Sequence, residues 1–219
     1  MQSFDTATFI GALLAFVIGT GVAKGSQAYV AYLIGERKPR SEGRMSLKPS
    51  RHLEILGIVL ALFMALGAGA VPWGKPLNTD NKTMRFGRFG NFLIGITGPI
   101  ALLVLGLLAI GVIRLFFDGS FLPLLTRTIY AFGYFSILLA AFNLIPLAPL
   151  DGYRIWIQGL LPVAWENKLY WLETYGPVLL LVLVLLLPGF FGVNLPFVFA
   201  APIVSFFLSL FGMQLQTQV

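Results

Sequence analysis

Long apolar stretches separated by short polar loops dominate the chain. The apolar runs follow one another at residues 8–35, 53–73, 92–117, 124–150, 175–188 and 196–211. A membrane-spanning helix needs about 20 mostly apolar residues, and most of these runs reach or approach that length. The pattern therefore predicts an all-α polytopic integral membrane protein with about five or six hydrophobic helical segments.

A more polar segment interrupts this series at residues 151–173. It carries several large aromatic side chains, namely Trp156, Trp165, Tyr170 and Trp171. Such a composition is typical of a segment that lies along the membrane interface. We expect one membrane domain over residues 1–219, with a core at about 8–160 followed by C-terminal hydrophobic helices at about 174–212.

Composition agrees with a membrane protein. Hydrophobic residues make up 58% of the chain and charged residues 11%, and the mean hydropathy is +0.86. A soluble domain carries about 25% charged residues. The net charge of +6 lies in loops, so it indicates topology rather than nucleic-acid binding. The chain has no cysteine, which excludes disulfides, iron–sulfur ligation and thiol catalysis.

Two basic loops flank the apolar run at residues 53–73. Residues 35–52 hold six Lys/Arg, and residues 74–91 hold four. Basic loops remain on the cytoplasmic side, so both are expected there. The run between them would then enter the membrane and return as a re-entrant hairpin that turns near Gly67–Gly69. The alternative is a plain crossing that violates the charge bias.

One motif in the middle of the chain is the stretch FNLIPLAPLDGYRI at residues 142–155. It resembles the Asn-Pro-Leu-Asp-Gly signature of a known family, the site-2 protease family of intramembrane metalloproteases. TGPIALLVLG at 97–106 is similar to its Gly-Pro helix. PWGKPLN at 72–78 and RMSLKPSRHLEILG at 44–57 resemble segments of short bacterial members. The motifs stand in the family's order and cover most of residues 20–160.

The resemblance implies a zinc-binding His-Glu-x-x-His motif on the first helix, and this chain departs from it. The five corresponding residues read Ala23, Lys24, Gly25, Ser26 and Gln27. Alanine and glutamine replace the two histidines, and lysine replaces the glutamate that acts as general base. In the family the aspartate that aligns with Asp151 is the third ligand, and it alone is retained. Catalytic zinc needs three protein ligands, so no cofactor is expected; zinc would be required only if an unorthodox site existed.

Other departures lie close to the same site. Asn143 is retained, whereas the asparagine expected in the Gly-Pro helix is Leu102, and the second glycine after the aspartate is Tyr153. His52 is the single histidine, at a position where short members carry a histidine that is not a ligand. We expect it to be a solvated loop residue. The departures cluster on the active site, while the scaffold motifs are kept.

A lysine at bilayer depth needs a partner, because an unpaired one costs about 2.5–3.5 kcal/mol on insertion scales. We predict an ion pair between Lys24 and Asp151, with Gln27 and Asn143 as hydrogen-bonding neighbours, that replaces the metal as a crosslink. Two alternatives stay open. Asp151 could snorkel to the interface and pair with Arg154, or Lys24 could face a water-filled cavity.

These features favour a catalytically inactive family member. It would act as a scaffold, an accessory subunit, or a regulator that binds transmembrane segments without cutting them. The alternative is an active intramembrane zinc metalloprotease that cleaves transmembrane substrates, and a third interpretation is a transporter-like polar pathway. The expected partners are membrane lipids and other integral membrane proteins, with no nucleic acid, in the cytoplasmic membrane of a bacterium.

Overall fold

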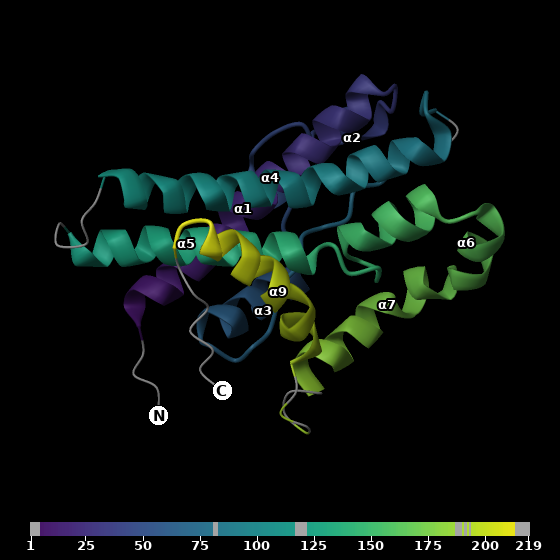
Figure 1. The fold of residues 1–219 in the computed structure, drawn as a ribbon. Coiled ribbons are helices and arrows are strands. Elements are labelled where there is room, and N and C mark those ends of the chain that lie inside the picture. The colour runs from purple at the N-terminus through teal and green to yellow at the C-terminus, as the bar shows by residue number, and fades with distance from the viewer. Residues whose placement is uncertain are drawn as a thin grey trace.

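The computed structural model describes residues 5–80, 83–116, 122–186, 190, 192 and 194–212, with only the backbone of 195 and 196. The regular elements in these residues are helices, with no strand among them. Three helices are long and apolar enough to cross a membrane: α1 (Thr6–Leu33), α4 (Gly87–Phe116) and α5 (Pro123–Phe142). They pack against one another, and α4 and α5 lie side by side (Figure 1). A helical membrane protein is thus confirmed.

The number of crossings is smaller than the number of apolar runs. A fourth candidate span consists of two helical pieces with a 50° bend between them. The first piece is α6 (Val163–Leu169). The second, Trp171–Leu186, comprises α7 (Trp171–Leu181) and η3 (Val182–Leu186). The apolar helices α3 (Ile55–Ala65) and α9 (Leu195–Ser209) are shorter than a span. Among the described residues there are therefore three or four candidate spans. The ends of the expected runs at residues 117 and 187–188 lie outside the described residues.

Small residues allow the three long helices to approach closely. A Cβ at Gly11 in α1 would lie 2.7 Å from the carbonyl oxygen of Thr128 in α5. Gly106 in α4 and Gly133 in α5 face each other, and a Cβ on Gly106 would lie 2.7 Å from the oxygen of Gly133. In lipid the hydrophobic effect does not drive helices together, because the lipid tails are as apolar as the side chains. Helices associate there through close van der Waals contacts of this kind.

The segment at residues 53–73 forms a hairpin. Helix α3 is followed by a turn and by an extended segment, residues 70–76, which returns beside it. The backbone nitrogen of Lys75 donates to the His52 oxygen at 2.7 Å, and Trp73 Nε1 donates to Glu54 Oε2 at 3.1 Å. The two ends therefore lie together, as the re-entrant interpretation requires and a plain crossing does not allow.

The turn of this hairpin lies at Gly67–Gly69, the residues at which the sequence predicted it. Gly67 and Gly69 have φ of +79° and +69°, a region that favours glycine. Asn194 holds the turn from outside, because its Nδ2 donates to the Gly69 oxygen at 2.7 Å. The Oδ1 atom of the same side chain accepts from Phe197 N at 3.1 Å and caps α9. One amide thus joins the tip of the hairpin to the start of the last helix.

Three short elements complete the fold near the hairpin and the end of α5. These are α2 (Lys38–Ser41), η1 (Pro49–Arg51) and the wide helical segment η2 (Tyr153–Leu160). The η2 segment packs against α4, where a Cβ on Gly95 would lie 2.8 Å from Ile155 Cγ1. The expected run at 124–150 is helical only to Phe142, and residues 143–150 form turns that lead to Asp151.

The hairpin depends on a glycine in α3. A Cβ on Gly57 would lie 2.1 Å from the Trp73 oxygen and 3.3 Å from Phe16 Cζ. We expect Gly57→Ala to destabilise the fold by about 1–3 kcal/mol, because the returning backbone must move away. Thermal unfolding in mild detergent measures this change.

A matched control is Gly111→Ala in α4, where the nearest atom to an added Cβ is at 3.7 Å. That variant should be neutral or slightly more stable, because alanine favours a helix. Equal stability of the two variants would contradict the close packing of the hairpin.

Candidate functional site

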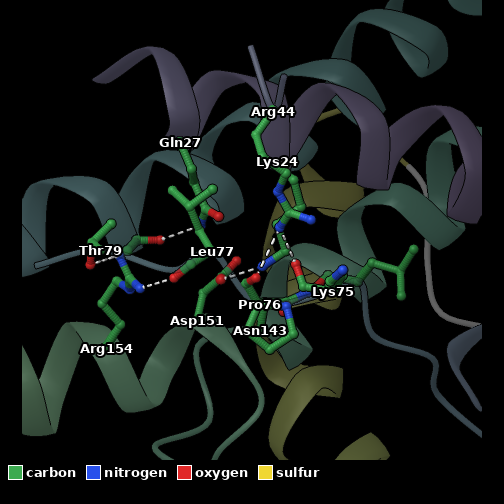
Figure 2. Close-up of polar contacts among 12 residues, drawn as sticks. Lys24, Gln27, Arg44, Lys75, Pro76, Leu77, Thr79, Asn143, Asp151 and Arg154 are labelled. Atoms are coloured by element: carbon green, nitrogen blue, oxygen red, sulfur yellow. Dashed lines mark hydrogen bonds and ion pairs between the residues drawn. The ribbon is translucent and has the colours of Figure 1, made fainter. Parts of the chain in front are cut away.

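The polar centre of the molecule is a contact between α1 and the turn after α5. Lys24 Nζ lies 2.5 Å from Asp151 Oδ1, and the two side chains are 4% and 7% exposed. Figure 2 shows the lysine on α1 above the aspartate. The structure therefore brings together a charge inside the first apolar run and a charge directly after the fourth. Neither side chain reaches solvent, so each depends on the other for its counter-charge.

A tight turn presents Asp151 to the interior. The backbone nitrogen of Gly152 donates to the Asn143 oxygen at 2.6 Å, which closes the loop between α5 and η2. A Cβ on Gly152 would lie 2.1 Å from the Ile145 oxygen, so only glycine fits there. The glycine of the Asp-Gly pair is therefore needed for the turn itself. It lets the backbone at residue 152 approach that of Ile145, and this turns Asp151 toward the interior.

Two more glycines bring neighbouring segments onto the ion pair. A Cβ on Gly98 in α4 would lie 2.4 Å from Gln27 Nε2 and 2.6 Å from Asp151 Oδ2. A Cβ on Gly74 in the returning segment would lie 3.5 Å from Lys24 Cε. Both glycines come from the family-like motifs at 97–106 and 72–78. The motifs therefore serve to pack α4 and the hairpin against the polar centre.

The space around the pair is almost completely filled. A cavity of about 10 Å³ remains beside Lys24 and Asp151, with Leu102 and Leu139 among its walls. One water molecule needs about 10–15 Å³. This space has room for one water molecule at most, which is less than the water-filled cavity of the alternative interpretation. Leu102, which stands where the family has an asparagine, contributes an apolar wall.

The residues at this centre do not fit a zinc ion. Within the described ranges, no group of three or more His, Cys, Asp or Glu side chains could hold a metal. Ala23 and Gln27 lie on the buried side of α1 with Lys24, and the half-buried Ser26 donates to the Val22 oxygen at 2.7 Å. None of the replacing side chains offers the imidazole, thiolate or carboxylate group that binds catalytic zinc.

The hydrogen bonds predicted from Gln27 and Asn143 to the ion pair are wrong. Gln27 Nε2 donates to the Gly95 oxygen at 3.3 Å, and Asn143 Nδ2 donates to the Leu139 oxygen at 2.8 Å. Both amides lie near helix carbonyl groups and bond to them. Asp151 Oδ2 consequently has no hydrogen-bond partner among the described residues.

The alternative pairing of Asp151 with Arg154 is not observed. Arg154 instead donates to Thr79 Oγ1 at 3.0 Å and to the Leu77 oxygen, as Figure 2 shows. It therefore ties η2 to the segment that follows the hairpin. The guanidinium is therefore bound to oxygens of residues 77 and 79 and not to the Asp151 carboxylate.

The expectation of a solvated His52 is also wrong. His52 is completely buried, and its Nε2 bonds to the Ser46 oxygen. It lies at the base of the hairpin, where its own oxygen accepts from Lys75. Burial lowers the pKa of His52 below its ordinary value of 6.5; the bond to Ser46 opposes this, and the charges of Arg44 and Lys24 add to it.

Sequence reasoning missed two charged side chains that join the basic loops. Arg44 is 4% exposed and donates to the oxygens of Arg51, Lys75 and Pro76, so it holds the loop at 35–52 to the returning segment. From the sequence alone, an arginine that binds backbone carbonyls cannot be told from one that only sets the orientation of a loop in the membrane. Its five donors suit a cluster of backbone carbonyls.

Glu36 has a comparable role at the end of α1. It accepts from the backbone of Lys38 and Asp80 and from Thr83 Oγ1. Burial raises the pKa of Glu36, but these hydrogen bonds outweigh burial and leave the pKa below its ordinary value. The carboxylate therefore stays charged and fixes the loop at 74–91 against α1.

A much larger cavity, of about 760 Å³, lies on the other side of the returning segment. Its walls come from residues 73–80, from residues 148–158 and from α7. Asp151 lines both this cavity and the small one beside Lys24. The aspartate therefore separates a filled polar centre from an open cavity.

The chain is similar to proteins of two bacteria. It is 32% identical over 164 residues to YwhC of Bacillus subtilis (strain 168), which is named as a zinc metalloprotease, and the match covers 72% of each chain. It is 27% identical over 148 residues to Rip2 of Mycolicibacterium smegmatis (strain ATCC 700084 / mc(2)155), also named as a zinc metalloprotease. That match covers 66% of this chain and 55% of the relative. No family model and no solved structure matches the chain.

The buried pair should be visible in a double-mutant cycle. We expect Lys24→Ala alone to cost about 3–5 kcal/mol of stability, because it leaves the Asp151 carboxylate buried without a counter-charge. The double variant Lys24→Ala with Asp151→Ala should be more stable than Lys24→Ala alone. Unfolding of the four proteins in detergent gives the coupling energy, and simple addition of the two single effects would disprove the pairing.

The buried His52 predicts a dependence of stability on pH. Its folded-state pKa lies below 6.5, so the unfolded chain binds the proton more readily. The contribution to stability is therefore present above 6.5 and lost as the pH falls through the folded-state pKa. We expect the thermal midpoint to fall between about pH 7 and about pH 5, and His52→Gln to show a smaller fall. The same pH profile in both proteins would exclude His52 as the source.

Proposed function

Because this chain belongs to the site-2 protease family, we propose that it is a non-catalytic member that has kept the family's fold and lost its metal site. It acts as a scaffold, an accessory subunit or a regulator in a membrane assembly. Its partners are other integral membrane proteins and lipids. It holds transmembrane segments without cutting them.

The observation that carries this proposal is the position of Lys24. Its ammonium lies 2.5 Å from Asp151, the only family ligand that the chain retains. A metal dication and an ammonium at the same carboxylate repel each other. The lysine also stands where the family has the glutamate that acts as general base, and an ammonium has no acceptor for a proton. The pair thus supplies the crosslink between α1 and the Asp151 turn that a metal would otherwise provide.

The hairpin supports a re-entrant arrangement in the bilayer. Its two ends are joined by the Lys75–His52 hydrogen bond, and Arg44 holds the flanking loops together. We place both basic loops, residues 35–52 and 74–91, on the cytoplasmic side of a bacterial cytoplasmic membrane, because basic loops remain there. The returning segment at residues 70–74 is buried in protein, as lipid requires of irregular backbone, whereas the turn at residues 66–68 is exposed.

Active proteolysis is the second candidate, and the names of the two relatives favour it. It requires a metal bound by residues other than the family's ligands. A transporter-like pathway has less support, because the cavity at the ion pair has a volume of only about 10 Å³.

Metal content separates the first two candidates. We expect the purified protein to contain no stoichiometric zinc by mass spectrometry. The triple variant Ala23→His, Lys24→Glu and Gln27→His should bind about one zinc ion per chain, because it restores two histidines one helical turn apart opposite Asp151. Adding Asp151→Ala to the triple variant should remove that zinc.

Stoichiometric zinc in the unaltered protein, lost in Asp151→Ala alone, would overturn the proposal and favour the protease. A chain without zinc that co-purifies with an integral membrane protein after gentle solubilisation would support the proposed role. The triple variant also serves as the positive control, because it tests whether the preparation can retain a metal.

A further inference from the structure

Three arginine side chains lie around the last turn of α1. Arg40 on α2 packs against Tyr32, with its Nη1 2.6 Å from the tyrosine hydroxyl and its guanidinium 4.9 Å from the centre of the ring. Arg85 is fixed at the same end of α1, because its backbone nitrogen donates to the Ile34 oxygen at 2.9 Å. Arg37 directly precedes α2, which Figure 1 shows beside the end of α1. We call these three residues the arginine cluster.

The arginine cluster has no carboxylate partner. All three residues are exposed. The ion pairs printed on the described part of the chain lie elsewhere, at Lys24–Asp151, Arg88–Glu166 and Arg127–Asp5. The neighbouring Glu36 is buried and already accepts three hydrogen bonds, and Glu42 acts on the charge of the buried Arg44. The cluster therefore presents a positive charge that the described residues do not balance.

Apolar and aromatic side chains of α1 lie next to the cluster. Tyr29 and Leu33 are 54% and 56% exposed, and their spacing from Tyr32 makes the three neighbours on the helix. Helix α1 is long and apolar enough to cross a membrane, so exposed side chains near its end contact lipid at the membrane surface. Arg40, bonded to Tyr32, stands at the polar edge of this surface.

We propose that the end of α1 binds an anionic phospholipid. The phosphate group lies among the guanidinium groups of the arginine cluster, and the acyl chains run along Tyr29 and Leu33 into the bilayer. A guanidinium is weakly hydrated and can donate two parallel hydrogen bonds to a phosphate. A free phosphate would leave the lipid-facing side chains without a matching group. The inference rests on the proposed function, which names lipids as partners, and it specifies their class and their site.

A lipid titration of the full chain in mild detergent tests the inference. The probes are phosphatidylglycerol and phosphatidylcholine with the same acyl chains, so they differ in the net charge of the headgroup. Native mass spectrometry should show about tenfold tighter binding of phosphatidylglycerol, because each basic residue near a membrane surface strengthens binding of an anionic lipid about fivefold. Glycerol phosphate, which lacks acyl chains, should not compete at the same concentration.

A double variant of the cluster locates the binding. Arg37→Gln with Arg40→Gln should reduce the preference for phosphatidylglycerol to about twofold, because two of the three cations are removed. Both side chains are exposed, so the thermal midpoint without added lipid should stay unchanged.

The matched control removes the same charge from the same two loops. Lys48 and Lys75 are exposed, and their chain neighbours Leu47 and Gly74 lie against residues 20–21 of α1, about three helical turns before its end. Lys48→Gln with Lys75→Gln should therefore keep the preference close to tenfold.

Equal affinity for the two lipids would overturn the inference. An equal loss of preference in both double variants would also overturn it, because net charge and not the arginine cluster would then attract the lipid. Competition by glycerol phosphate would identify a free phosphate as the ligand instead. Zinc content is measured separately. A chain without zinc and without lipid preference overturns this inference alone, whereas a chain with zinc that prefers phosphatidylglycerol overturns the proposed function alone.

Discussion

A buried charge must have a counter-charge, and the arrangement around Lys24 follows from that requirement. Inside an apolar helix bundle the ammonium cannot rely on water, so its partner Asp151 has to be held within hydrogen-bond distance. Gly152 permits the turn that presents the aspartate, and Gly98 lets α4 pack against it. Each of these positions has no room for a side chain, so the ion pair and the helix packing depend on one another.

The hairpin completes this arrangement from the side of the two basic loops. Gly74 packs against Lys24, and Arg44 binds the oxygens of the returning segment. These contacts join α1, the hairpin and the basic loops without a metal. A family scaffold can therefore remain folded after its ligands are lost, because backbone hydrogen bonds and one ion pair connect the elements that a metal would have connected.

Asp151 stands between two different environments. One of its oxygens pairs with Lys24 in a space with little room for water, and the residue also lines an open cavity with other carboxylates. Asp151 therefore joins α1 to the turn after α5 through its pair with Lys24, and it also forms part of the wall of the larger cavity.

The sequence by itself determined the long helices, since backbone in lipid must form its own hydrogen bonds and an apolar run of sufficient length can only be a helix. It also indicated the Lys24–Asp151 contact, because the family resemblance implies that Asp151 faces the first helix, where Lys24 needs a counter-charge. Only the tertiary structure decided the partners of Gln27, Asn143 and His52, since an amide or imidazole can bond to any nearby carbonyl. The large cavity is likewise a tertiary feature, because its walls come from segments far apart in the chain.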